Sequence, residues 1–166
     1  TTKRLSLFGG YRYDWFNGGW PAEHADANPF VAARDVAAAD PSIRLHIFTA
    51  LTLETPRSRP GLERRFLQPF AQRVFAGYPE LAYAKALHAG TLPANIIVDE
   101  FFFQAGTRLG IAAAQQSYIS ANYTHALRCV LDRGVNVVAQ LVAKREGEGG
   151  TRLSLSCNPD LSFDLL

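Results

Sequence analysis

Several segments of the chain have the hydrophobic pattern of β-strands. Residues 43–53 (IRLHIFTALTL) and 152–157 (RLSLSC) alternate between apolar and polar positions, which is typical of strands. Residues 135–143 (VNVVAQLVA) form a nearly continuous apolar run, which indicates a strand buried on both faces of a sheet. Residues 96–103 (IIVDEFFF) and the short segment 5–8 are also predicted strands. We expect 152–157 to pair with 135–143 as a hairpin.

Helical patterns lie between these strands. In residues 62–75, apolar side chains recur at a spacing of four, which predicts an amphipathic helix with Pro69 inside it. Further helices are predicted at 28–39, 80–89, 111–116 and 124–133. The alternation of the two element types predicts an α/β fold, with an open, mostly parallel sheet and flanking helices.

The first part of the chain lacks a sustained period. Glycine pairs at Gly9-Gly10 and Gly18-Gly19 favour turns in this part. The sequence therefore predicts an irregular N-terminal segment over residues 1–27, followed by one α/β domain over residues 28–166.

Composition limits the class of protein. A length of 166 residues fits one domain, and 48% hydrophobic against 19% charged residues excludes global disorder. A net charge of +2 predicts neither a nucleic-acid partner nor an anionic membrane partner. The chain has no signal peptide pattern and no apolar run of about 18 residues. Cys129 and Cys157 have no CxxC spacing, so we expect reduced thiols and a cytoplasmic location.

The two ends of the sequence suggest a fragment. The chain begins at Thr1, contains no methionine, and stops in the apolar stretch 163–166. We expect a trimmed chain or a piece of a longer one. Its apolar end suggests a missing partner surface, such as another copy in a homo-oligomer.

A polar segment before the predicted helix 124–133 is the main candidate site. In open α/β sheets, loops that lead from strand ends into helices line the ligand crevice. Asn122 or Thr124 can cap the helix, and His125 can titrate near neutral pH. The alternative is plain capping with a satisfied histidine. The candidate substrate-binding residues are Gln115, Gln116, Asn122, Tyr123, Thr124 and His125.

Two adjacent acids interrupt the apolar strand 96–103. Because neighbouring strand residues point to opposite faces, Asp99 and Glu100 cannot both face one pocket. One of them could have a raised pKa and act in acid, base or nucleophilic chemistry. In the alternative, they reach solvent or a neighbouring arginine.

Other motifs are weaker. Arg57, Arg59, Arg64 and Arg65 form a basic patch that is either a solvated face or a phosphate contact. The glycine pairs do not match the spacing of a phosphate-binding loop. The four histidines are dispersed, so the sequence predicts no metal site.

Longer stretches resemble a known family. Residues 100–145, which include "QQSYISANYTH" and "DRGVNVVAQ", resemble the N-terminal half of the acetyl-CoA hydrolase/transferase family. The stretches "RLHIFTALTLETP" and "RLSLSCNPDLSFDLL" are similar to the same half, so the resemblance runs from about Asn28 to Leu166. It implies an α/β fold of the CoA-transferase type, with acyl-CoA and a small carboxylate bound between two halves and no separate cofactor.

The resemblance also implies covalent chemistry. A glutamate carboxylate attacks the acyl-CoA thioester, which gives an acyl anhydride and then a glutamyl-CoA thioester that a carboxylate or water resolves. In the family this glutamate belongs to the second half, so no catalytic residue is assigned here and the isolated chain is expected to be inactive. The segment "WFNGGWPAEHADANPF" departs from the family's loop before the first helix. The alternative function is a non-catalytic α/β interface module or a truncated remnant.

Overall fold

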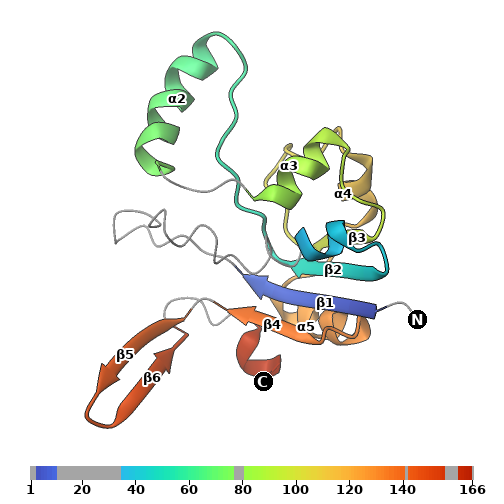
Figure 1. The fold of residues 1–166 in the computed structure, drawn as a ribbon. Helices are drawn as coiled ribbons and strands as arrows, with labels where there is room; N and C mark the ends of the chain where they lie inside the picture. Colours follow the sequence, from blue (N-terminus) through green and yellow to red (C-terminus); the bar gives the residue numbers. More distant parts are fainter. Residues whose placement is uncertain (1–2, 11–34, 77–80, 141, 156–160, 166) are drawn as a thin grey trace.

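The protein has a mixed α/β fold built on a parallel sheet. A computed structural model describes residues 3–10, 35–76, 81–140, 142–155 and 161–165. The four parallel strands have the spatial order β3-β2-β1-β4, and two further strands form a separate antiparallel hairpin (Figure 1). The strands are β1 (Lys3–Gly10), β2 (Ile43–Thr49), β3 (Ile96–Glu100), β4 (Val137–Gln140), β5 (Ala143–Gly147) and β6 (Gly150–Ser154).

Helices lie on both faces of the parallel sheet. Residues 35–39 are helical, and the named helices are α2 (Leu62–Val74), α3 (Ala82–Ala89), α4 (Ala112–Gln116), α5 (Tyr123–Asp132) and α6 (Ser162–Leu165). In Figure 1, α3 and α4 lie on one side of the sheet, and α5 and α6 lie on the other. The described strands and helices confirm the α/β class.

Two apolar clusters hold these layers together. On one face, Leu45 and Ile47 of β2 pack with Tyr83 and Ala84 from α3. On the opposite face, Phe48 packs with residues of α5 and α6. Because successive strand residues point to opposite faces, a strand buried on both sides needs apolar residues at consecutive positions. This requirement explains the run Leu45–Phe48, in which only His46 is polar.

The strand order creates a switch point between β1 and β4. The chain moves outward from β1 to β2 and β3, and then returns to place β4 on the other side of β1. At the carboxyl ends of this pair, Gly9 aligns with Ala139, and Gly10 aligns with Gln140. Open α/β sheets bind ligands outside the carboxyl ends of their strands at such a point.

Most predicted elements are confirmed, with shifted boundaries. Strand β1 is longer than the predicted segment 5–8, so the segment expected to be irregular begins with a strand that includes Gly9-Gly10. The remaining residues of that segment, with the first part of the predicted helix 28–39, lie outside the described residues, as does Cys157. Strands β2 and β3 are shorter than predicted because their ladder ends at the pair Thr49–Glu100.

The predicted hairpin is wrong in its partner strand. β4 ends at Gln140 and pairs with β1, whereas β6 pairs with the separate strand β5. The alignment of Gly147 with Gly150 leaves a tight turn between them. Strand β5 (AKREG) was missed because its exposed polar sequence has no hydrophobic period.

Two elements extend away from the packed layers. Helix α2 has no buried residue, and Leu62 and Phe66 of its predicted apolar stripe are 80% and 75% exposed. Both strands of the β5–β6 hairpin are exposed along their whole length. In Figure 1, both elements project beyond the end of the sheet to which the β1 arrow points. Among the described residues, no helix is sufficiently long and apolar to cross a membrane.

Candidate functional site

A cluster of charged side chains lies just beyond the carboxyl ends of β2 and β3. Glu54 follows β2, Glu100 is the last residue of β3, and Arg108 lies in the turn after β3. The guanidinium of Arg108 is 2.6 Å from Glu54 Oε1 and 3.6 Å from Glu100 Oε2. His88, from α3, places its Nε2 atom 2.8 Å from Glu54 Oε2. We call these four residues the Glu54 cluster.

The cluster has a buried end and an accessible end. The side chains of Glu100 and Arg108 are 3% and 4% exposed, whereas those of Glu54 and His88 are 18% and 23% exposed. Burial raises the pKa of Glu100, and the hydrogen bond from the Thr52 amide and the charge of Arg108 offset this only in part. Because ligands approach from solvent, Glu54 and His88 are the members that a ligand can contact.

The Nε2 atom of His88 has two hydrogen-bonding neighbours. It is 2.8 Å from both Glu54 Oε2 and Arg108 Nη1. A guanidinium only donates, and an imidazole nitrogen either donates or accepts. Without a proton, Nε2 accepts from Arg108, and the Glu54 carboxylate is satisfied by its own contact with the Arg108 guanidinium. With a proton, Nε2 donates to Glu54. His88 can therefore pair with either neighbour, depending on its tautomer.

Asp99 forms a second cluster on the opposite face of β3. Asp99 Oδ2 accepts hydrogen bonds from His46 Nε2 at 2.8 Å and from Arg133 Nε at 2.5 Å. The Arg133 guanidinium also lies 5.5 Å from the ring centroid of Phe48. Burial raises the pKa of Asp99, but His46 and Arg133 outweigh burial and hold that pKa below its usual value. The prediction that Asp99 and Glu100 serve different faces is confirmed.

The predicted polar segment is attached to the carboxyl end of β3. Tyr118 forms a parallel bridge with Glu100, and the Ile119 amide donates to the Glu100 carbonyl at 2.9 Å. The ring of Tyr123 meets Phe101 edge-on, at a centroid distance of 5.2 Å. These contacts hold the segment at the carboxyl end of β3, next to the backbone of Glu100, one member of the Glu54 cluster.

The structure separates the six predicted site residues into two groups. Asn122 caps α5: its Oδ1 accepts from the Thr124 amide at 3.1 Å and lies 2.8 Å from His125 Nδ1. Gln115 instead donates to the Arg108 and Leu109 carbonyls at 3.1 and 2.7 Å, which braces the turn that carries Arg108. Gln116 lies exposed at the end of α4. The capping prediction is therefore confirmed, and the binding role of all six residues remains a prediction.

Sequence reasoning missed three members of the Glu54 cluster. Glu54 lies in a proline-containing loop, and His88 was one of four dispersed histidines. Their separations in sequence, 34 positions from His88 to Glu54 and 20 from Arg108 to His88, follow no motif. Only the apolar flanks of Glu100 carried a signal, because a carboxylate in such a strand needs a partner.

The structure adds little support for the other candidate sites, which are a metal site, Cys129 and the basic patch. Within the described ranges, no group of three or more His, Cys, Asp or Glu residues could hold a metal ion. Cys129 is a half-buried free thiol packed at the edge of the apolar cluster around Phe48. The four arginines of the predicted basic patch are all exposed, in the loop before α2 and on α2 itself.

Comparison of the chain with family models, with curated proteins and with solved structures gives no match.

Proposed function

We propose that this chain is one half of an acyl-CoA hydrolase or CoA-transferase, with a fold of the CoA-transferase type. The chain supplies the surface that binds acyl-CoA and a small carboxylate. The reactive glutamate lies on a second α/β half. The observation that carries this proposal is the attachment of the 115–125 segment to the carboxyl end of β3 in a parallel sheet, because that edge is where such sheets bind ligands.

The Glu54 cluster adds chemistry suited to this role. Its accessible members, Glu54 and His88, place a carboxylate and an imidazole at the carboxyl edge of the sheet. Hydrolysis of a thioester requires the attacking water to lose a proton as the thiolate leaves, and side chains of these two types can accept that proton. In this proposal, Arg108 is a positioning residue, because its guanidinium fixes Glu54 and His88 and is itself buried.

A direct test is calorimetric titration of the chain with CoA, together with a thiol-release assay on acetyl-CoA. We expect saturable CoA binding without turnover. Absence of CoA binding would contradict the proposal, and robust turnover by this chain alone would contradict its assignment as a half-site.

A matched pair of variants locates the binding surface. Gln116→Glu adds a negative charge to the predicted binding segment, whereas Gln72→Glu makes the same change on α2, also at an exposed position. We expect Gln116→Glu to weaken CoA binding roughly fivefold, as about 1 kcal/mol of charge repulsion would. We expect Gln72→Glu to leave binding unchanged. Equal effects of the two variants would place CoA elsewhere.

A second candidate function is a non-catalytic interface module. The observation in its favour is α2, a helix with no buried residue and with phenylalanine and leucine side chains in solvent. Exposed apolar faces of this kind mark protein interaction surfaces. A chain that binds no CoA would favour this second function.

A further inference from the structure

The two faces of the β5–β6 hairpin differ in how their charges are satisfied. On one face, Lys144 Nζ lies 2.6 Å from Glu146 Oε1, and the Thr151 hydroxyl donates to Glu146 Oε2 at 2.7 Å. Every charge on this face therefore has a partner of opposite sign or a hydrogen bond.

The other face carries two arginines directly opposite each other. Arg145 of β5 aligns with Arg152 of β6, so the two side chains leave the hairpin on the same side. Neither side chain forms an ion pair with any residue in the described part of the chain. Like charges at directly opposed positions destabilise a strand pair. An anion that contacts both guanidinium groups would remove this repulsion.

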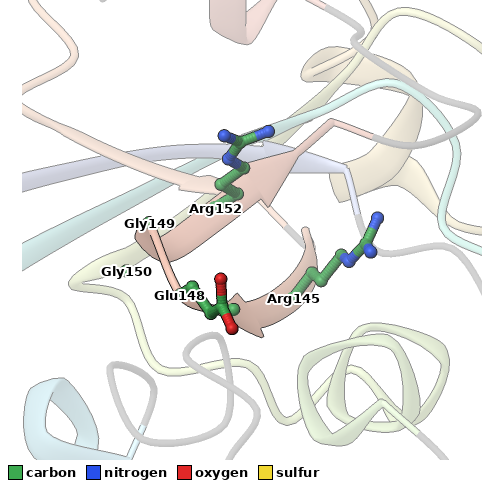
Figure 2. A pocket seen from close by; sticks show the side chains of 6 residues that line it. Arg145, Glu148, Gly149, Gly150 and Arg152 are labelled. Carbon is green, nitrogen blue, oxygen red and sulfur yellow. The ribbon is translucent and has the colours of Figure 1, made fainter.

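A hollow of about 210 Å³ lies beside this arginine pair. It is lined by Arg145, Gly147, Glu148, Gly149, Gly150 and Arg152. Figure 2 shows the two guanidinium groups well separated from each other and from the Glu148 carboxylate. A Cβ atom on Gly149 would lie 3.6 Å from NH2 of Arg152, so the Arg152 guanidinium lies over the turn. The hollow is thus bordered by two guanidinium groups, by glycine backbone and by one carboxylate, that of Glu148.

We propose that this arginine face of the hairpin binds a phosphate-containing small molecule through a diphosphate group. The planar guanidinium fork matches phosphate oxygens in a bidentate manner, and two forks match two phosphoryl groups. The small volume of the hollow and the net charge of only +2 favour a small anion over a nucleic acid. This proposal does not depend on the CoA function.

The test measures inorganic pyrophosphate binding by calorimetry for the full chain and its variants. Arg145→Ala and Arg152→Ala should each weaken binding about tenfold, because each removes a charge-assisted contact. Lys144→Ala is the matched control: it removes one positive charge from the same hairpin on the paired face, and it should change binding little. Arg152→Lys keeps the charge and loses the fork, so it should also weaken binding.

The outcomes separate this site from the CoA function. An equal loss in Lys144→Ala and the arginine variants would show an effect of net charge alone and would overturn the site. Loss of pyrophosphate binding in both arginine variants, with CoA binding retained, would support the site as separate from the proposed function and leave that function intact. Pyrophosphate binding that depends on the arginines, without any CoA binding, would support the site and contradict the proposed function. Because both strands are fully exposed, circular dichroism should show the same fold in every variant.

Discussion

Asp99 and Glu100 are neighbours in one strand, yet they occupy opposite electrostatic environments. Asp99 accepts two hydrogen bonds from cationic or polarisable groups, His46 and Arg133, and the pKa of Asp99 is lowered. Glu100 accepts from the Thr52 amide and has its nearest cation, Arg108, at 3.6 Å, and the pKa of Glu100 is raised. The difference arises first from burial, because the Glu100 side chain is 3% exposed and that of Asp99 is 9% exposed. It also arises because Arg108 is shared with Glu54, whereas Arg133 makes its closest contact with Asp99.

The two faces of the strand therefore use charge differently. On the Asp99 face, attraction exceeds the cost of burial, so the ion pair holds α5 against the sheet through the Arg133 side chain at the end of that helix. On the Glu100 face, burial exceeds attraction, so the pKa of Glu100 is raised above its ordinary value. A buried carboxyl group whose pKa is raised because burial outweighs its ion pair is typical of functional sites.

Loss of Arg108 should have the largest effect. Arg108→Ala leaves Glu54 and the buried Glu100 without their cation, and removing one partner from a buried ion pair costs about 3–5 kcal/mol. We expect chemical denaturation to show a loss of this size. A much smaller loss of unfolding free energy would show that the Glu54 cluster is less buried in solution than in the structure.

Arg133→Ala is the control for this comparison. The Arg133 side chain is 31% exposed, so water can replace part of its contact with Asp99. We expect a smaller loss of unfolding free energy than for Arg108→Ala. A larger loss in Arg133→Ala than in Arg108→Ala would show that the ion pair on the Asp99 face stabilises the fold more than the Glu54 cluster does. That result would contradict the proposed difference between the two faces.

Asp99→Asn should have an intermediate effect with a clear pH dependence. At neutral pH we expect a loss of about 2 kcal/mol, the size of a hydrogen bond to a charged group. The folded pKa of Asp99 lies below its ordinary value of 3.8, so its contribution is present above that pH and is lost as pH falls through the folded pKa. Denaturation curves of the wild type and Asp99→Asn should therefore converge in acid. A constant gap at all pH values would contradict an electrostatic role for Asp99.

The difference between the faces was only partly accessible from sequence. Alternation along 96–100 was sufficient to place Asp99 and Glu100 on opposite faces, because strand geometry fixes side-chain direction. The buried strands and the Asn122 cap were predictable for the same reason, since each depends on residues close in sequence. The partners were not predictable, because Arg108 and His88 reach Glu54 only through tertiary packing.

Helix α2 and the β5–β6 hairpin, which are both exposed, also show what the sequence pattern does not predict. The spacing of Leu62 and Phe66 predicted helix α2 correctly, but an amphipathic period does not reveal whether the apolar stripe has a partner within the chain. The β5–β6 hairpin depends on a turn at Gly147–Gly150 and on backbone pairing. The alternation at 152–157 predicted the strand β6, but the polar sequence of β5 gave no periodic signal.

Glu100→Gln should have the smallest effect at neutral pH and the opposite pH dependence. The amide retains an acceptor for the Thr52 amide and removes the charge that burial disfavours, so we expect a change within about 1 kcal/mol. Because the folded pKa of Glu100 lies above its ordinary value of 4.5, its contribution is complete below that pH and is lost as pH rises through the folded pKa. In the wild type, this term makes stability fall over that interval, and Glu100→Gln should remove the fall. Paired denaturation series from about pH 3 to about pH 8, a range that spans the titration of carboxyl groups, would measure the slope. If Glu100→Gln and Asp99→Asn changed the slope with the same sign, the two carboxylates would share one environment, and the distinction between the faces would be wrong.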